Sequence, residues 1–122
     1  MKLLIVDDSP TIAALIESFM EQRFADKFEV EICTHSSEVP QLLAENHFDV
    51  VLTDVFMPEM DGYEVIQHLK SHHPDTAVIA MSSGYTHASA ESSLQAAKFL
   101  GAVTSINKNN LSSDLERVFA TF

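Results

Sequence analysis

Short apolar runs alternate with segments of helical periodicity along the chain. The apolar runs predict five strands, at residues 3–6, 28–33, 50–54, 77–81 and 103–106. Apolar residues between and after these runs recur at spacings of three and four, which predicts five helices, at residues 10–20, around Leu42 and Leu43, and at residues 62–72, 87–100 and 111–122. This alternation is typical of an α/β protein with a parallel sheet, right-handed crossovers and helices on both faces.

Local signals refine several of these elements. The run 28–33 alternates apolar with charged residues, so we expect an edge strand with one wetter face. Ser9 supplies an N-cap hydroxyl ahead of Pro10 for the first helix, and Ser36 or Ser37 is expected to cap the second. The fourth helix is rich in Ala and Ser and has few apolar residues, so it is expected to be the least stable.

Polar residues stand at the C-terminal ends of four of the apolar runs. They are Asp7, Asp8, Asp54, Ser82 and Lys108. Because the C-terminal ends of parallel strands lie along one edge of a sheet, these side chains are expected to meet there. Open α/β sheets bind their ligands at that same edge.

The chemistry of this set favours a cation. At about 5 Å and an effective dielectric near 20, each pair of carboxylates repels by roughly 3 kcal/mol, so the cluster costs stability unless a positive charge offsets it. Hard carboxylate oxygens in a partly wet crevice suit Mg²⁺, and Lys108 can neutralise part of the same charge. Any one of these acids alone is more often a helix cap, and it is their conjunction that indicates a site.

Composition narrows the classes of function. With 122 residues, 46% of them hydrophobic, the chain is expected to form a single domain over residues 1–122. Its formal charge of -11 argues against direct contact with nucleic acid or with an anionic membrane. Cys33 is the only cysteine, and neither a signal peptide nor a membrane-spanning run is visible, so we expect a cytoplasmic protein.

These motifs together resemble the receiver domain of two-component response regulators. The resemblance is carried by Asp7-Asp8 after an apolar strand, Asp54 with the following Val-Phe-Met-Pro-Glu-Met-Asp-Gly, Ser82, and Lys108. The spacings of 46, 28 and 26 residues from Asp8 to Asp54, Ser82 and Lys108 in turn also agree with that family, over essentially the whole chain. The resemblance implies a doubly wound, flavodoxin-like (βα)5 fold with strand order 2-1-3-4-5.

The resemblance also implies a reaction. Asp54 would accept a phosphoryl group from a phosphohistidine of a sensor histidine kinase or a histidine phosphotransfer protein. Asp8 and Asp54 would bind Mg²⁺ directly and Asp7 through water, and the backbone carbonyl of Phe56 would complete the ligands from the protein. Phosphoryl transfer would then depend mainly on the positioning of the reacting groups and on neutralisation of their charge.

Two further residues match the family, and two depart from it. Ser82 would bond the phosphoryl group, and Lys108 stands where the family has its ion-pairing lysine. Ser105 occupies a position that is commonly aromatic, and Asn109 replaces the usual proline. We therefore expect switching to run through residues 83–88 and the helix after them, with Tyr85 a weaker candidate for the missing aromatic.

Other functions remain open at this stage. A Mg²⁺-dependent phosphohydrolase of the haloacid-dehalogenase type would also use a nucleophilic Asp, but it carries a second Asp where Phe56 stands. A pseudo-receiver that binds partners unphosphorylated is the other alternative. We expect no turnover enzyme.

The partners implied are the kinase and a downstream protein target or output domain. Because no output domain follows Phe122, the chain either acts alone or was cut from a longer regulator. Phe119 and Phe122 are expected to cover the sheet, with some apolar area left for a partner or a homodimer. His68 and His72 have a spacing that can bind zinc, but no acid or thiol completes the set, so a solvated surface is favoured.

Overall fold

A computed structural model describes residues 1–82, 95–98 and 100–122. All five predicted strands are present, namely β1 (Lys2–Val6), β2 (Glu29–Cys33), β3 (Val50–Asp54), β4 (Ala77–Ser82) and β5 (Thr104–Asn107). They pair in parallel in the order β2-β1-β3-β4-β5. The prediction of a doubly wound parallel sheet with this strand order is therefore confirmed.

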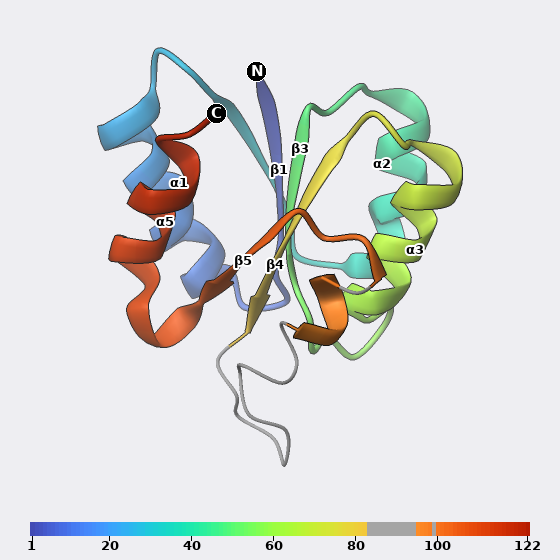
Figure 1. The fold of residues 1–122 in the computed structure, drawn as a ribbon. Coiled ribbons are helices and arrows are strands. Elements are labelled where there is room, and N and C mark those ends of the chain that lie inside the picture. Colours follow the sequence, from blue (N-terminus) through green and yellow to red (C-terminus); the bar gives the residue numbers. More distant parts are fainter. Residues whose placement is uncertain (83–94, 99) are drawn as a thin grey trace.

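Helices cover both faces of the sheet (Figure 1). One face carries α1 (Pro10–Phe24) and α5 (Leu111–Phe119), and the other carries α2 (Val39–Glu45) and α3 (Gly62–His72). Most of the predicted helix at residues 87–100 lies outside the described residues; residues 95–98 and 100 are helical. None of the described helices combines the length and the apolar character that crossing a bilayer needs.

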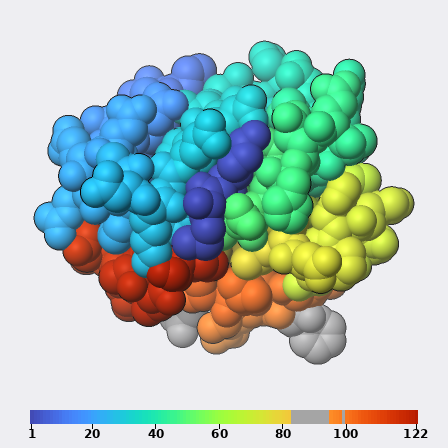
Figure 2. Space-filling model, turned by 90° about the horizontal axis from the view of Figure 1, so that it is seen from above, coloured from blue at the N-terminus to red at the C-terminus, as the bar shows by residue number. Residues whose placement is uncertain are grey.

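The strands form a core on each face because successive side chains of a strand point to opposite sides. In β1, Leu4 and Val6 pack with α2 and α3, whereas Leu3 and Ile5 pack with α1 and α5. Figure 2 shows the end of the sheet where the strands begin, with the start of β1 between β2 and β3. Only β2 alternates exposed with partly buried positions, and it lies at an edge of the sheet, which confirms that it is the wetter edge strand.

Aromatic side chains fill the space between α1, α5 and β2. The rings of Phe28 and Phe119 meet edge to face with centroids 5.2 Å apart, and Phe122 stacks on Phe119 at 5.7 Å. Phe119 is completely buried and Phe122 is partly buried against the same core. The prediction that these two residues cover the sheet is confirmed.

Side-chain caps begin α1 and α3, whereas no side chain caps α2. Ser9 Oγ accepts a hydrogen bond from the Ile12 amide, which caps α1 as predicted. The α3 helix begins with a reciprocal capping box between Asp61 and Glu64. These caps set the directions in which α1 and α3 leave the C-terminal edge of the sheet.

The predicted cap of α2 by Ser36 or Ser37 is wrong. Both serines lie in a short 3-10 turn, η1 (Ser36–Glu38), and no side chain caps α2. Pro40 stands near the start of this helix and has no N–H, so a capping side chain would find one donor fewer there. Both serine hydroxyls bond instead to the segment after β3.

Candidate functional site

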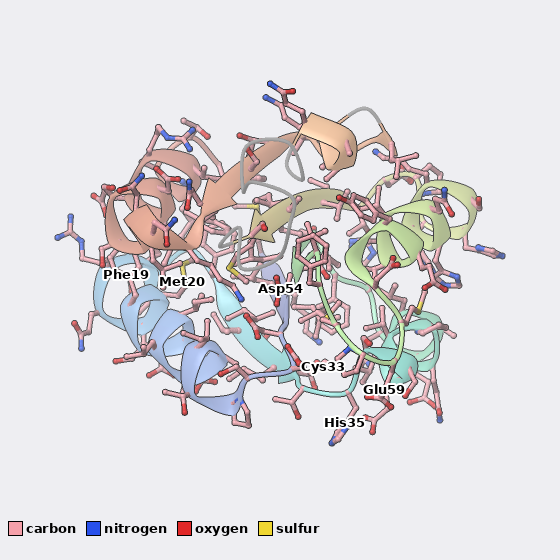
Figure 3. All side chains as sticks on the ribbon, turned by 90° about the horizontal axis from the view of Figure 1, so that it is seen from below. Phe19, Met20, Cys33, His35, Asp54 and Glu59 are labelled. Atoms are coloured by element: carbon pink, nitrogen blue, oxygen red, sulfur yellow. The ribbon has the colours of Figure 1, made fainter. Side chains whose placement is uncertain are left out.

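Four strand ends deliver the predicted polar residues to one edge of the sheet. Asp7 follows β1 directly, and its amide donates a hydrogen bond of 3.1 Å to the carbonyl of Cys33 at the end of β2. Asp54 ends β3, Ser82 ends β4, and Lys108 follows β5. Figure 3 looks at this edge, with Asp54 near its centre.

The three acids form a compact cluster. One carboxylate oxygen from each of Asp7, Asp8 and Asp54 lies within 4.8 Å of the other two. Asp7 is completely buried and Asp54 is 7% exposed, whereas Asp8 is exposed and opens the cluster to solvent. The convergence predicted from the strand ends is therefore present.

Lys108 joins the two buried acids. Its Nζ lies 2.8 Å from Asp7 Oδ2 and 3.0 Å from Asp54 Oδ2, and its side chain is 14% exposed. One ammonium thus faces three carboxylates, which leaves a local excess of negative charge. Loss of Lys108 would leave two buried carboxylates with little water to solvate them, whereas loss of Asp54 would leave the ammonium paired with Asp7.

Burial and charge shift the ionisation of the site. Burial raises the pKa of Asp54; Lys108 opposes this, and Asp7 and Asp8 add to it. For Lys108, burial alone would lower the pKa, but hydrogen bonding and attraction to Asp7 and Asp54 outweigh it, so its pKa is raised. The lysine is therefore cationic at neutral pH, whereas the charged form of Asp54 is held at a cost in free energy.

These residues fit a hydrated divalent cation. Asp7 Oδ2 is buried, and the Lys108 ammonium lies 2.8 Å from it. The cluster offers only carboxylate oxygens, the ligand type that Mg²⁺ prefers, and Asp8 leaves a side open for metal-bound water. The acids could therefore hold Mg²⁺, with Lys108 beside them.

Two backbone contacts place the segment that follows Asp54. The Val55 amide bonds to the Met81 carbonyl at 3.0 Å, and the Gly62 amide bonds to the Val55 carbonyl at 2.8 Å. A Cβ on Gly62 would lie 2.3 Å from the Asp54 carbonyl oxygen and 2.6 Å from Val55 Cα. Glycine is needed here because the start of α3 touches the backbone at the end of β3.

Gly62→Ala is accordingly expected to destabilise the protein by about 2 kcal/mol, since backbone atoms have to move to admit the methyl group. Urea denaturation measures the loss, and Ser71→Ala, on the exposed part of the same helix, is the control. A Gly62→Ala midpoint equal to that of Ser71→Ala would show that the close approach carries no constraint.

The remaining candidates have different outcomes. The Phe56 side chain is 37% exposed, and the role of its carbonyl as a metal ligand stays a prediction. Ser105 lies in β5, and its carbonyl accepts a hydrogen bond from Arg117. The expected switching segment, residues 83–88 with Tyr85, lies outside the described residues.

Neither Cys33 nor the pair His68 and His72 forms a reactive or metal-binding site within the described residues. Cys33 is buried and donates to the His35 carbonyl, and burial raises the pKa of its thiol, which makes it a poor nucleophile. The rings of His68 and His72 stack at 4.5 Å. Among the residues described, only the three aspartates form a group of three or more His, Cys, Asp or Glu side chains close enough to share an ion.

Sequence reasoning missed a set of contacts beside the acids. Ser36, Ser37 and His35 bond to Glu59 and Met60, in the segment between β3 and α3. No periodicity or motif marks this pairing, because it joins two irregular segments more than 20 residues apart in the chain.

Comparison with known proteins identifies the class. The profile of the response regulator receiver domain matches residues 3–119. The chain therefore belongs to the response regulator receiver family.

Individual relatives support this assignment. The response regulator protein PilR of Pseudomonas aeruginosa is 35% identical over 97 residues, which cover 80% of this chain and 20% of that protein. A probable cyclic di-GMP phosphodiesterase of Vibrio cholerae is 42% identical over 74 residues, which cover 61% of this chain and 16% of that protein. The chain thus spans a fifth or less of the length of these two relatives.

A solved structure has the same fold. The response regulator receiver domain protein from Clostridium thermocellum superimposes with a TM-score of 0.82 at 28% identity, over 98% of this chain and 91% of that one.

Proposed function

We propose that Asp54 accepts a phosphoryl group from the phosphohistidine of a sensor histidine kinase or a histidine phosphotransfer protein. The observation that carries this proposal is the meeting of Asp54 with Asp7 and Asp8 within 4.8 Å, with Lys108 on the same carboxylate. A carboxylate oxygen of Asp54 attacks phosphorus, the phosphorus–nitrogen bond breaks, and the histidine nitrogen keeps the electron pair. The product is an acyl phosphate at the open edge of the sheet.

The metal ligands in this proposal are Asp7, Asp8 and Asp54, with the backbone carbonyl of Phe56. When bound, Mg²⁺ supplies positive charge for the phosphoryl oxygens. Lys108 holds its ammonium beside the reacting carboxylate, where it offsets part of the same charge. Burial of Asp7 and Asp54 limits competing water around these groups.

Ser82 is proposed to read the phosphorylated state. It is completely buried at the end of β4, next to Met81, whose register partner in β3 is Asp54. A hydrogen bond from its hydroxyl to a phosphoryl oxygen would tie the end of β4 to the new group. Through this bond, Ser82 would report the phosphorylated state to a partner.

The partners proposed are the kinase or phosphotransfer protein, a downstream protein target or output domain, and a second copy of this chain in a homodimer. The formal charge of -11 argues against direct nucleic-acid or membrane contact by residues 1–122, which we propose to act as one domain. A cytoplasmic location, where kinase and ATP meet, belongs to the same proposal.

A turnover enzyme is not proposed. An Asp-dependent phosphohydrolase needs an acid or base next to its nucleophile, and the position two residues after Asp54 holds the apolar, 37% exposed Phe56. The relative named a phosphodiesterase matches over only 16% of its length, so its activity is not carried over by this match. Slow loss of the phosphoryl group to water is the only hydrolysis expected.

Phosphoryl uptake can be tested without knowing the kinase. Acetyl phosphate with Mg²⁺, or beryllofluoride as a stable substitute for the phosphoryl group, should move the backbone amide signals of Ser82 and Ser105 and of residues 83–86. Omission of Mg²⁺ should abolish the change. An unchanged spectrum, or the same response in Asp54→Asn, would contradict the proposal. If the signals do move, phosphotransfer from a panel of sensor kinases identifies the natural donor.

A further inference from the structure

The segment between β3 and α3 is held by three hydrogen bonds from the segment after β2. The Met60 amide donates to Ser36 Oγ at 2.8 Å, and Ser37 Oγ donates to Glu59 Oε2 at 2.8 Å. His35 Nδ1 lies 3.3 Å from Glu59 Oε1, and because a carboxylate only accepts, this nitrogen is the donor. We call these contacts the 35–60 clasp; Figure 3 shows His35 beside Glu59.

The clasp combines two exposed bonds to Glu59 with one part-buried bond to the Met60 amide. Both carboxylate oxygens of Glu59 are engaged, each by a different residue. Ser36 is only 2% exposed, so its bond to the Met60 amide is shielded from water. Met60 also packs against the buried core on the α2 and α3 face. The clasp therefore has a defined geometry on both sides.

The same segment is tied to the first acid of the cluster. The Asp7 amide donates to the Cys33 carbonyl at 3.1 Å, and the Cys33 thiol donates to the His35 carbonyl at 3.1 Å. The end of β2 thus bonds to Asp7 on one side and, through the clasp, to residues 59 and 60 on the other. A single segment connects two parts of the chain that carry proposed metal ligands.

Residues 55–61 form a loop that is held by hydrogen bonds near both of its ends, at Val55 and at Glu59 and Met60. At the base, the Gly62 amide bonds to the Val55 carbonyl at 2.8 Å, and Gly62 rests against the Asp54 backbone. At the far end, the clasp holds Glu59 and Met60. With both ends fixed, the conformational freedom of Phe56 between them is small, and so is the entropy its carbonyl loses on binding an ion.

We propose that Glu59, Ser36 and Ser37 are positioning residues for the Mg²⁺ and phosphorylation site. They act through residues 55–61 and touch neither the ion nor the phosphoryl group. This inference rests on the proposed function, since it needs Phe56 and the aspartates to hold the ion. Residues that hold the ligands of a metal ion in place without touching the ion commonly affect its affinity.

Glu59→Ala is the main test, with Glu38→Ala as a matched control. Glu38 lies in the η1 turn with Ser36 and Ser37, is exposed, carries the same charge as Glu59 and takes no part in the clasp. We expect Glu59→Ala to raise the Mg²⁺ dissociation constant, measured by calorimetry, about fivefold relative to Glu38→Ala. In metal-free buffer, hydrogen exchange of the amides of residues 56, 57, 59 and 60 should be faster in Glu59→Ala alone.

Two further measurements separate positioning from a general loss of structure. The Mg²⁺ concentration for half-maximal phosphorylation by acetyl phosphate should rise in Glu59→Ala, while the rate at saturating Mg²⁺ approaches that of wild type. Glu59→Gln keeps an acceptor for Ser37 and should recover part of the affinity. A merely structural role would lower the melting temperature without shifting the Mg²⁺ requirement.

Failure of the inference differs from failure of the proposed function. If wild type binds Mg²⁺ and is phosphorylated but Glu59→Ala matches Glu38→Ala in Mg²⁺ affinity and in hydrogen exchange, the clasp has no positioning role. If wild type neither binds Mg²⁺ nor takes up phosphate, the proposed function fails and the positioning role fails with it.

Discussion

Asp54→Asn will take up no phosphoryl group and will nevertheless unfold at a higher temperature than wild type in metal-free buffer. The first effect follows from replacing the nucleophilic carboxylate by an amide. The second follows from the raised pKa of Asp54, because burial and the neighbouring Asp7 disfavour its charged form more than Lys108 favours it. Removing that charge should stabilise the protein by about 1 kcal/mol, or roughly 4 °C in melting temperature.

The stabilisation should depend on pH with a definite sign. A carboxylate whose pKa is raised in the folded state costs stability above that pKa, and the cost disappears once the pH falls below its ordinary value. The gain from Asp54→Asn should therefore be full above the raised pKa and vanish toward about pH 4. Asp75→Asn, in the exposed turn before β4, removes the same charge and should show neither effect.

Mg²⁺ should reverse the order of stabilities. An ion that binds only the folded state adds about 2.7 kcal/mol at 100 times its dissociation constant, so wild type should gain strongly from saturating Mg²⁺. Asp54→Asn lacks one of the three clustered carboxylates and should gain much less. If wild type and the variant respond equally to Mg²⁺, Asp54 is not part of the metal site.

Lys108→Met should destabilise the protein by roughly 3 kcal/mol at neutral pH. The ammonium lies 2.8 Å from Asp7 Oδ2 and 3.0 Å from Asp54 Oδ2, and its loss leaves two buried carboxylates without their counter-charge. Because the pKa of Lys108 is raised, its stabilising contribution is complete at neutral pH and is lost only when the pH rises through that value.

Acid and Mg²⁺ should each relieve the defect. As the pH falls, Asp54 takes up a proton, so the difference between Lys108→Met and wild type should shrink toward about pH 4. Mg²⁺ should recover part of the loss at pH 7, because it offsets the same negative charge. Chemical denaturation across pH measures both effects, and the exposed Lys98→Met is the control. If the stability lost in Lys108→Met is the same at every pH, its cause is lost packing of the side chain and not lost charge.

The clasp and the lysine act on different parts of the same site. Lys108 sets the charge balance of the acids, whereas Glu59 and Ser36 hold the segment that follows Asp54. Variants of the two kinds should therefore differ in their signatures. Loss of the lysine should appear mainly as a pH-dependent stability change, and loss of the clasp as a change in Mg²⁺ requirement.

The sequence alone determined the order of the elements, the edge position of β2 and the residues that meet at the C-terminal edge. The physical reason is that periodicity of two or 3.6 residues is a local signal, and parallel pairing sends every strand's C-terminal end to one side. The convergence of the site residues follows from the sequence because each stands at a strand end, namely Asp7, Asp54, Ser82 and Lys108. The strand order and the residue roles were implied by family resemblance.

Only the tertiary structure decided how these groups meet. That Lys108 spans Asp7 and Asp54 depends on distances between segments remote in the chain. That Asp8 stays exposed and that Gly62 rests on the end of β3 depend on the three-dimensional paths of the chain after β1 and β3. Ser36 shows the limit most clearly. Its local context favours a helix cap, but a donor 24 residues away takes its hydroxyl, because packing brings two irregular segments together.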